Sequence, residues 1–271
     1  MVPVFIKALR DSRRTIIALS IGFALYALFV LAFYPSILEE QESFDEMMQS
    51  YPEELLGFMT GGQDISEFSI SDPGTFLSTE FSIWMVLIMG AIVIRQALNS
   101  VTNPERDGTM DMMLSLPVSR TEVLLGHIAA MIVMLLTVLT AALGALLLGR
   151  AIWPEFDVSF IAMARAIYGA LFLLMVIGGF TFVLATLFPS RARFIGGIAY
   201  LFLIGSYLLH GFTGVIDSLS GLHSFFIFDY YNVRLLINEG IKPEDWALLI
   251  GLATAFLAFS WWNFDRKELG V

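Results

Sequence analysis

Residues 128–149 read IAAMIVMLLTVLTAALGALLLG, a run of 22 residues without a charged side chain. As an α-helix, this run is long enough to cross the hydrocarbon core of a bilayer, which takes about 20 mainly apolar residues. A helix satisfies its own backbone hydrogen bonds there, where water is absent. The run therefore predicts a transmembrane helix, and five further runs of the same kind occur along the chain.

The six predicted spans are nearly free of charge, since Glu80 is the only Asp, Glu, Lys or Arg in any of them. They comprise residues 15–34, 76–94, 128–149, 166–188, 194–216 and 246–264. The predicted fold class is therefore all-α, a single polytopic membrane domain over residues 1–271 with six transmembrane helices.

The composition agrees with a membrane protein and excludes several other classes. Hydrophobic residues make up 57% of the chain and charged residues 15%, whereas a soluble domain carries about 25% charged residues. The absence of cysteine excludes disulfides, thiolate metal sites and a cysteine nucleophile. The formal net charge of -10 argues against a nucleic-acid partner, which needs a basic surface.

The distribution of bases predicts the orientation in the membrane. An even number of spans places both termini on one side, and Lys and Arg are enriched in cytoplasmic segments. Eleven of the 15 bases fall in residues 1–14, 95–127, 189–193 and 265–271, and four fall in the remaining connections. We therefore expect cytoplasmic termini, a location in the plasma (cytoplasmic) membrane, and exterior loops at 35–75 and 217–245.

The first 14 residues are predicted to form an amphipathic helix. Val4 and Ala8 lie on its apolar face at helical spacing, and Lys7 and Arg10 lie on the other face. Such a helix is expected to rest its apolar face at the headgroup boundary while its bases meet anionic membrane lipid.

The cytoplasmic loop 95–127 contains the clearest local signals. Met110 and Met113 share one face of a short predicted helix, and Pro117 ends that helix. Ser119 and Glu122 form a predicted capping box at the start of the helix that enters the third span. A methionine face suits a groove in a partner protein; packing on the chain's own cytoplasmic ends is the alternative.

The chemical motifs of enzymes are absent from the sequence. No Gly-Lys-Ser/Thr phosphate loop, His-Glu-x-x-His zinc motif or Gly-x-Ser-Gly protease motif occurs. We therefore expect no catalytic residue, metal or cofactor on this chain, and any ATP that drives it must bind another subunit. His210 and Ser206 lie four residues apart without an acid nearby in sequence, which favours helix packing.

Glu80 is the candidate for a residue on a transport path, because an ionisable side chain within a membrane span is costly and by default suggests function. A structural role at the membrane boundary is the alternative.

The stretch NPERDGTMDMMLSLPVSR at residues 103–120 resembles the hallmark of type-2 ATP-binding-cassette (ABC) permeases. Residues 52–57, 225–229 and 264–269 are also similar to that family, although Glu268 and Asn103 stand where members usually have Asp and Glu, respectively. The resemblance implies a pore-forming exporter subunit that forms a homodimer. Each copy would dock a separate ATPase subunit that binds ATP and Mg.

The resemblance also implies a role for two segments. Residues 1–14 correspond to the family's elbow helix, and the loop between the second and third spans holds its coupling helix. The residues expected to contact or support the ATPase are Glu105, Arg106, Gly108, Thr109, Met110, Asp111, Met113 and Pro117. Two other functions stay open: a non-transporting anchor or sensor subunit, and an intramembrane enzyme, which would need Glu80, His210 and Ser206 to converge.

Overall fold

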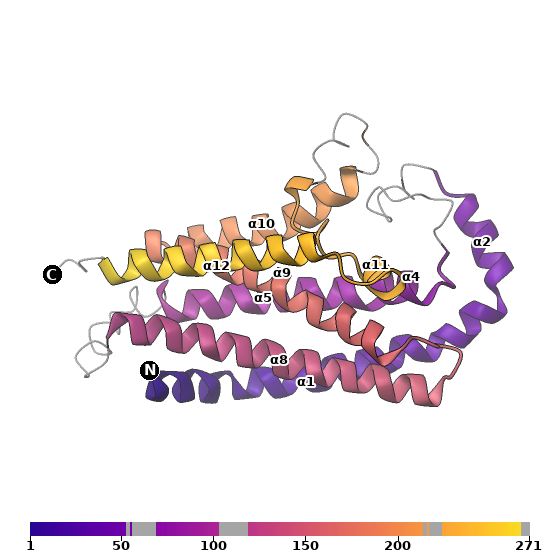
Figure 1. Ribbon diagram of the computed structural model, residues 1–271, viewed down its shortest axis with the longest axis horizontal. Helices are drawn as coiled ribbons and strands as arrows, with labels where there is room; N and C mark the ends of the chain where they lie inside the picture. Colours follow the sequence, from indigo (N-terminus) through magenta and orange to yellow (C-terminus); the bar gives the residue numbers. More distant parts are fainter. Residues whose placement is uncertain (53–54, 56–68, 103–118, 214–215, 217–223, 267–271) are drawn as a thin grey trace.

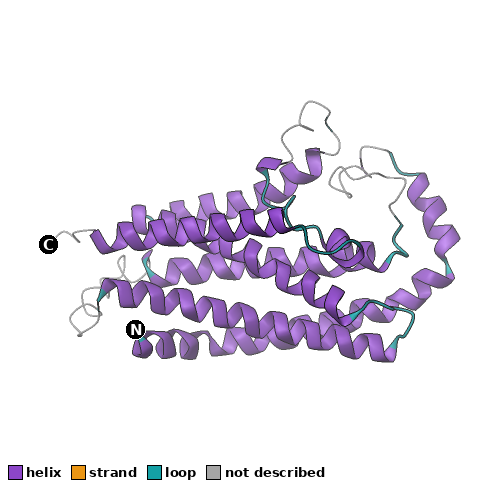
Figure 2. Cartoon of the chain, viewed as in Figure 1, coloured by secondary structure: helices purple, strands orange, loops and turns teal. Residues whose placement is uncertain are grey.

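The computed structural model describes the whole chain except residues 53–54, 56–68, 103–118, 214–215, 217–223 and 267–271. The described part is built of helices joined by loops and turns and has no strand (Figure 2). Its helices are α1 (Val2–Glu39), α2 (Gln41–Gln49), α4 (Pro73–Leu77), the π-helix η2 (Ser78–Ser82), α5 (Ile83–Ser100), α8 (Arg120–Ile152), α9 (Phe160–Leu187), α10 (Ala192–Thr213), α11 (Val233–Asn238) and α12 (Pro243–Arg266).

Six helical stretches are long and apolar enough to cross a membrane, and each coincides with one of the predicted spans, although the predicted spans 166–188 and 194–216 run past the last residues of α9 (Leu187) and α10 (Thr213). The prediction of six spanning helices is therefore confirmed. Helices α4, η2 and α5 together form one of these stretches, Pro73–Ser100. Each observed stretch begins before its predicted span, because hydropathy detects only the part of a helix that needs lipid, whereas the backbone pattern continues into polar turns.

Helix α9 is at the centre of the bundle. In the most apolar 18-residue segment of α9, 67% of the residues are buried, compared with 22% in the corresponding segments of α1 and α12. Small residues let its neighbours approach: a Cβ atom at Gly178 would lie 2.8 Å from Val93 of α5, and one at Gly179 would lie 3.0 Å from Phe256 of α12. Close packing around small residues is the usual way in which membrane helices associate.

Helices α1 and α8 run side by side along much of their length (Figure 1). A Cβ atom at Gly149 would clash with Cδ1 of Leu31, so the two helices are in close contact near one end. The face of α1 that points away from α8 is an apolar stripe at helical spacing, as expected of a surface in contact with lipid. Its exposed side chains are Ile17, Ile21, Leu25, Phe29 and Phe33.

The leader differs from the sequence-based expectation. Helix α1 is unbroken from Val2 to Glu39, so residues 1–14 do not form a separate helix. Val4 and Ala8 are buried, and Val4 lies against Gly126 of α8. The apolar face that we expected to rest at the headgroups therefore packs on α8, because α8 begins at Arg120, before the predicted span, and offers the leader a protein surface.

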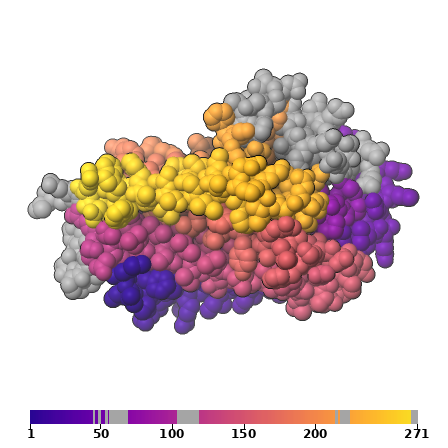
Figure 3. Space-filling model, in the orientation of Figure 1, coloured from indigo at the N-terminus to yellow at the C-terminus, as the bar shows by residue number. Residues whose placement is uncertain are grey.

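Both ends of the described chain lie at one end of the bundle, which we call the terminal end (Figure 1). The space-filling view in Figure 3 shows α12 beside α8 and the first turns of α1 below them at this end. The opposite end holds α2, α4 and α11.

Candidate functional site: the start of helix α8 and the groove beside Glu80

The predicted coupling residues lie outside the described part of the chain. These are Glu105, Arg106, Gly108, Thr109, Met110, Asp111, Met113 and Pro117. The structure does describe both boundaries of this segment. On one side α5 ends at Ser100, and Val101 and Thr102 are buried. On the other side Ser119 is the N-cap of α8.

The capping box at Ser119 has the predicted geometry. The Ser119 hydroxyl accepts a hydrogen bond from the backbone N–H of Glu122 at 3.1 Å, and the Ser119 backbone N–H donates to the Glu122 carboxylate at 3.1 Å. Two backbone donors at the start of the helix are thereby satisfied. The first turn of α8 is therefore fixed directly after the segment that carries the coupling motif.

The same turn is connected to the two helices that hold the chain ends. The Thr121 hydroxyl donates to the Asp265 carboxylate at 2.8 Å, and the Trp261 indole N–H donates to the Thr121 oxygen at 3.1 Å. The amino group of Met1 lies 2.6 Å from the Glu122 carboxylate. We call these five residues the α8 clamp. It joins α1, α8 and α12 at the terminal end.

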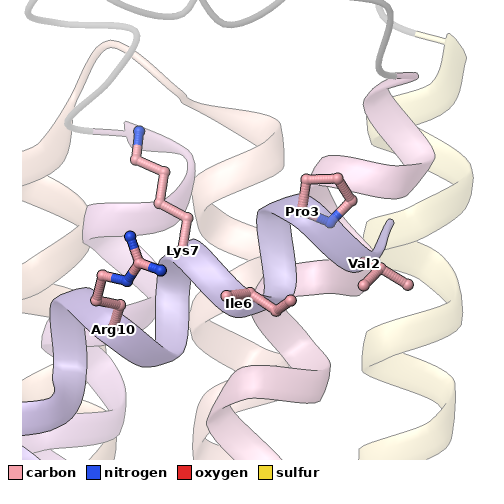
Figure 4. Close-up of a pocket in the computed structure, with 5 residues that line it drawn as sticks. All are labelled: Val2, Pro3, Ile6, Lys7 and Arg10. Atoms are coloured by element: carbon pink, nitrogen blue, oxygen red, sulfur yellow. The ribbon is translucent and has the colours of Figure 1, made fainter.

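A notch of about 390 Å³ lies on the leader, outside the clamp. It is lined by Val2, Pro3, Ile6, Lys7 and Arg10. In Figure 4 the side chains of Lys7 and Arg10 extend on one side of the helix, away from Val2 and Ile6. An apolar surface next to two cations matches the amphipathic character of an anionic lipid headgroup and its chains.

Glu80 lies at the junction of α4, η2 and α5. It is half-buried in the π-helix, and π-helical turns are common at functional sites. The Tyr26 hydroxyl of α1 donates to the backbone carbonyl of Glu80, and the Tyr26 ring stacks on Phe81 with centroids 5.5 Å apart. Phe23 meets the same Phe81 ring edge-on at 6.4 Å.

An open groove of about 330 Å³ runs between α1 and α5 next to this junction. Its lining residues are Ala18, Leu19, Gly22, Phe23, Tyr26, Trp84 and Ile88. Trp84 and Ile88 are exposed and lie four residues apart on α5, so they share one side of that helix, whereas Glu80 lies in the preceding π-helical turn and is not among the lining residues. Sequence reasoning found Glu80 but missed the groove, although this spacing and the ring of Trp84 were a visible signal.

His210 has an acid near it in space that the sequence did not reveal. Nδ1 of His210 lies 4.0 Å from Oδ1 of Asp229, which belongs to the segment before α11. That segment returns into the bundle: Tyr231 is buried and its hydroxyl donates to the carbonyl of Ala166 at 2.9 Å. Burial raises the pKa of the Tyr231 hydroxyl, so the group stays a neutral donor.

In the part of the chain that the structure describes, Glu80 contacts α1 through Tyr26 and has no hydrogen bond or ion pair with His210 or Ser206. Nor do three His, Asp or Glu side chains cluster as metal ligands among those residues.

The geometry is that of a polytopic helical membrane protein, with six stretches that are long and apolar enough to span a membrane and a capped helix start at the terminal end. The chain belongs to the family of the multidrug efflux system permease Rv1217c, C-terminal domain, whose model matches residues 5–265. The match includes all six spanning stretches except the first residues of α1 and the last residue of α12. No curated protein matches the chain.

Proposed function

We propose that this chain is the membrane subunit of a type-2 ABC exporter. In this role it couples ATP hydrolysis by a separate ATPase subunit to the export of a substrate. Membership in an efflux-permease family supports transport, and the resemblance of residues 103–120 to the coupling motif supports the ABC mechanism. ATP and Mg bind the partner in this scheme, because the sequence has no phosphate loop.

The observation that carries the proposal is the position of the motif directly before the α8 clamp. A force applied to residues 103–118 is passed to Ser119 and the first turn of α8. Thr121 and Glu122 of that turn are bonded to α12 and α1, so the three helices respond together. Helix α8 has 33 residues, which corresponds to about 50 Å of helix, enough to carry the movement across the membrane.

Within the motif, Met110 and Met113 form the apolar face that enters a groove of the ATPase, while Glu105 and Arg106 orient it. Closure of two ATPase subunits then moves two copies of this chain relative to each other, which requires a dimer. A homodimer is the simplest assembly that a single type of chain can form.

The orientation follows from the distribution of bases. The terminal end faces the cytoplasm of the cell, where the ATPase and ATP are found, and the loops 35–75 and 217–245 face the exterior. Lys7 and Arg10 beside the leader notch then meet anionic lipid of the cytoplasmic leaflet of the plasma membrane. Both residues precede the apolar stripe of α1, which begins at Ile17, so they can lie at the membrane surface while the stripe contacts lipid.

The test is co-purification of the ATPase with the double variant Met110→Asp/Met113→Asp. Two charges on the apolar face should abolish association, because an unpaired carboxylate is costly in an apolar groove. The matched control is Met47→Asp on α2 at the opposite end, where Met47 is exposed; it should leave association unchanged. Undiminished association of the double variant, with normal membrane insertion, would overturn the proposal.

Flux distinguishes an exporter from an anchor or sensor. The reconstituted pair of permease and ATPase should hydrolyse ATP faster in the presence of substrate and move that substrate. Hydrolysis that is indifferent to substrate, with no flux, would instead assign the chain the role of a non-transporting subunit.

A further inference from the structure

The exposed face of the leader continues the apolar stripe of α1. Residues 2, 6, 10, 13 and 17 follow one another at steps of three or four, so they lie along one side of the helix, and all five are exposed. Val2 and Ile6 are apolar, Arg10 and Arg13 are basic, and Ile17 begins the stripe. Bases in line with apolar side chains are typical of a helix surface that contacts both lipid headgroups and acyl chains.

Contacts with α8 show how deep these bases lie in the membrane. Three pairs of residues join the two helices: Met1 with Glu122, Val4 with Gly126, and Leu31 with Gly149. In these pairs the α8 number exceeds the α1 number by 121, 122 and 118, so the helices run parallel with an almost constant offset. Lys7 is therefore level with about residue 128 of α8, where the run without charged side chains begins. The bases that follow Lys7 lie beside an entirely apolar part of their neighbour.

Helix α12 gives an independent mark of the membrane boundary. Asp265, near its end, is bonded to Thr121 in the first turn of α8. Trp261 and Trp262 precede Asp265 by about one turn and are exposed. Exposed Trp side chains are enriched where the membrane meets water. The boundary therefore falls near the first turns of α8, and the bases of the leader lie at or inside it.

The bases of the leader lack an acidic partner within the protein. There are four exposed bases in the leader: Lys7, Arg10, Arg13 and Arg14. Among the residues that the structure describes, none of the four forms an ion pair, and Asp11 is the one acid in residues 1–14. A charge at this depth is costly unless it reaches the interface or finds a counter-ion. Arginine and lysine bind phosphate through strong charge-assisted hydrogen bonds.

The notch of about 390 Å³ combines both kinds of surface, since Lys7 and Arg10 line it together with Val2, Pro3 and Ile6 (Figure 4). We propose that the notch is a discrete site for one anionic phospholipid, which places its phosphate on the two bases and its hydrocarbon on the apolar side chains of α1. The orientation of the chain brings the leader near anionic lipid in general. The notch goes further, because it predicts one tightly held lipid per chain.

Other occupants use only part of this surface. A free phosphate ion pairs with the bases but gains nothing from Val2 and Ile6. A zwitterionic lipid has the chains but no net charge to offset the bases. A second copy of this chain would have to bring an acid to the notch, whereas the stripe that leads to it, from Ile17 to Phe33, is apolar. Charge and apolar contact together therefore favour an anionic lipid.

The experiment is native mass spectrometry of the full chain in detergent, titrated with phosphatidylglycerol. Phosphatidylcholine with the same acyl chains tests the role of net charge, and glycerol 3-phosphate tests the role of the chains. We expect saturable binding of one phosphatidylglycerol per chain, at least about tenfold weaker binding of phosphatidylcholine, and no saturable binding of glycerol 3-phosphate.

One set of variants tests the bases. Lys7→Gln/Arg10→Gln should weaken phosphatidylglycerol binding about 25-fold, since each base near an anionic headgroup contributes about a factor of five. Lys7→Arg keeps the charge and should change binding by at most about threefold. The matched control is Arg191→Gln/Arg193→Gln, which removes the same charge from two exposed bases on the predicted cytoplasmic side; it should bind as the unmodified chain does.

A second variant tests the notch with both bases in place. Ile6→Asp puts a carboxylate beside Lys7 and Arg10, where it competes with the phosphate, and should weaken binding about tenfold. Ile152→Asp is its control at the other end of α8, because Ile6 and Ile152 are 47% and 52% exposed. The control should have no effect, and both proteins should unfold like the unmodified chain.

Four results would overturn the proposal. Equal binding of the two phospholipids would indicate an acyl-chain groove, and glycerol 3-phosphate that binds as tightly as the lipid would indicate a phosphate site. An equal loss in Arg191→Gln/Arg193→Gln would indicate general attraction to a basic surface. A change in the number of copies in the particle in Ile6→Asp, with lipid binding unchanged, would make the notch a contact between copies. The readout needs neither ATPase nor flux, so it is independent of the proposed function.

Discussion

The terminal end of α8 and the groove beside Glu80 use polar side chains in opposite ways. In the α8 clamp, polar groups are paired with each other: Thr121 with Asp265, and Glu122 with Met1. Beside the groove, the Glu80 backbone is held by Tyr26, while its carboxylate has no ion pair with a Lys or Arg among the described residues. Paired groups hold helices together, and the first turn of α8 has such pairs with two neighbouring segments, whereas Glu80 has one hydrogen bond to α1, through its backbone.

The two regions also differ in how closely their helices are packed. Gly126, near the clamp, leaves no room for a side chain, because a Cβ atom there would lie 3.0 Å from Val4 and 3.2 Å from the backbone nitrogen of Phe5. Gly22, in the groove, has nothing within 4 Å. The terminal end therefore behaves as one body, and the groove remains open.

The largest effect is expected from breaking the close contact at the terminal end. Gly126→Leu forces the leader away from α8, because the backbone of Phe5 cannot yield as a side chain does. We expect a loss of about 1–3 kcal/mol in the free energy of unfolding, the usual cost of overpacking. Denaturant unfolding in detergent measures it. Gly144→Leu on the same helix has open space and should be neutral; an equal loss there would show that α1 and α8 do not pack as described.

The next effect separates stability from coupling. Ser119→Ala removes the N-cap of α8 and should cost about 1 kcal/mol of stability. Ser159 caps α9 at the opposite end, accepting from the N–H of Ala162 at 3.2 Å, so Ser159→Ala should cost a similar amount. Only Ser119→Ala should reduce the ATPase activity of the reconstituted pair that depends on substrate. If both caps change this activity equally, the start of α8 has no special part in coupling.

These two serines also show what sequence reasoning reaches. A capping box links residues three apart, so Ser119 and Glu122 were visible without any knowledge of the fold. The six spanning helices were equally accessible, since hydropathy over about 20 residues reports directly on the solvent a helix needs. Both signals are local in the chain.

What sequence reasoning missed depends on contacts between distant segments. Tyr26 reaches Glu80 across 54 positions, and Thr121 reaches Asp265 across 144. Asp229 approaches His210 only because its segment folds back into the bundle. The amphipathic pattern of the leader is the same whether its apolar face meets lipid or another helix, so the pattern alone does not predict which of the two it contacts. Only the early start of α8 decides between them.

A smaller effect is expected from the bond that joins α8 to α12. A double-mutant cycle of Thr121→Val and Asp265→Ala should give an interaction free energy of about 0.5–1 kcal/mol, since Asp265 is exposed, Thr121 is half-buried and the bond competes with water. This interaction free energy is calculated from the free energies of unfolding of four proteins: the unmodified chain, both single variants and the double variant. An interaction free energy of zero would mean that α12 is not held by the first turn of α8.

The smallest effect is expected at the other end of the same helix. Arg150 in the last turn of α8 lies 2.8 Å from Asp157, but the side chains are 37% and 81% exposed. Exposed ion pairs contribute about 0–1 kcal/mol and are screened by salt. A cycle of Arg150→Ala and Asp157→Ala should therefore give about 0.3 kcal/mol at low salt and nearly none at 1 M salt. The Thr121–Asp265 value should barely change over that range, because a hydroxyl carries no net charge to screen. Equal salt dependence of the two cycles would mean that the clamp is also only a surface ion contact, and the two ends of α8 would then not differ in how firmly they are held.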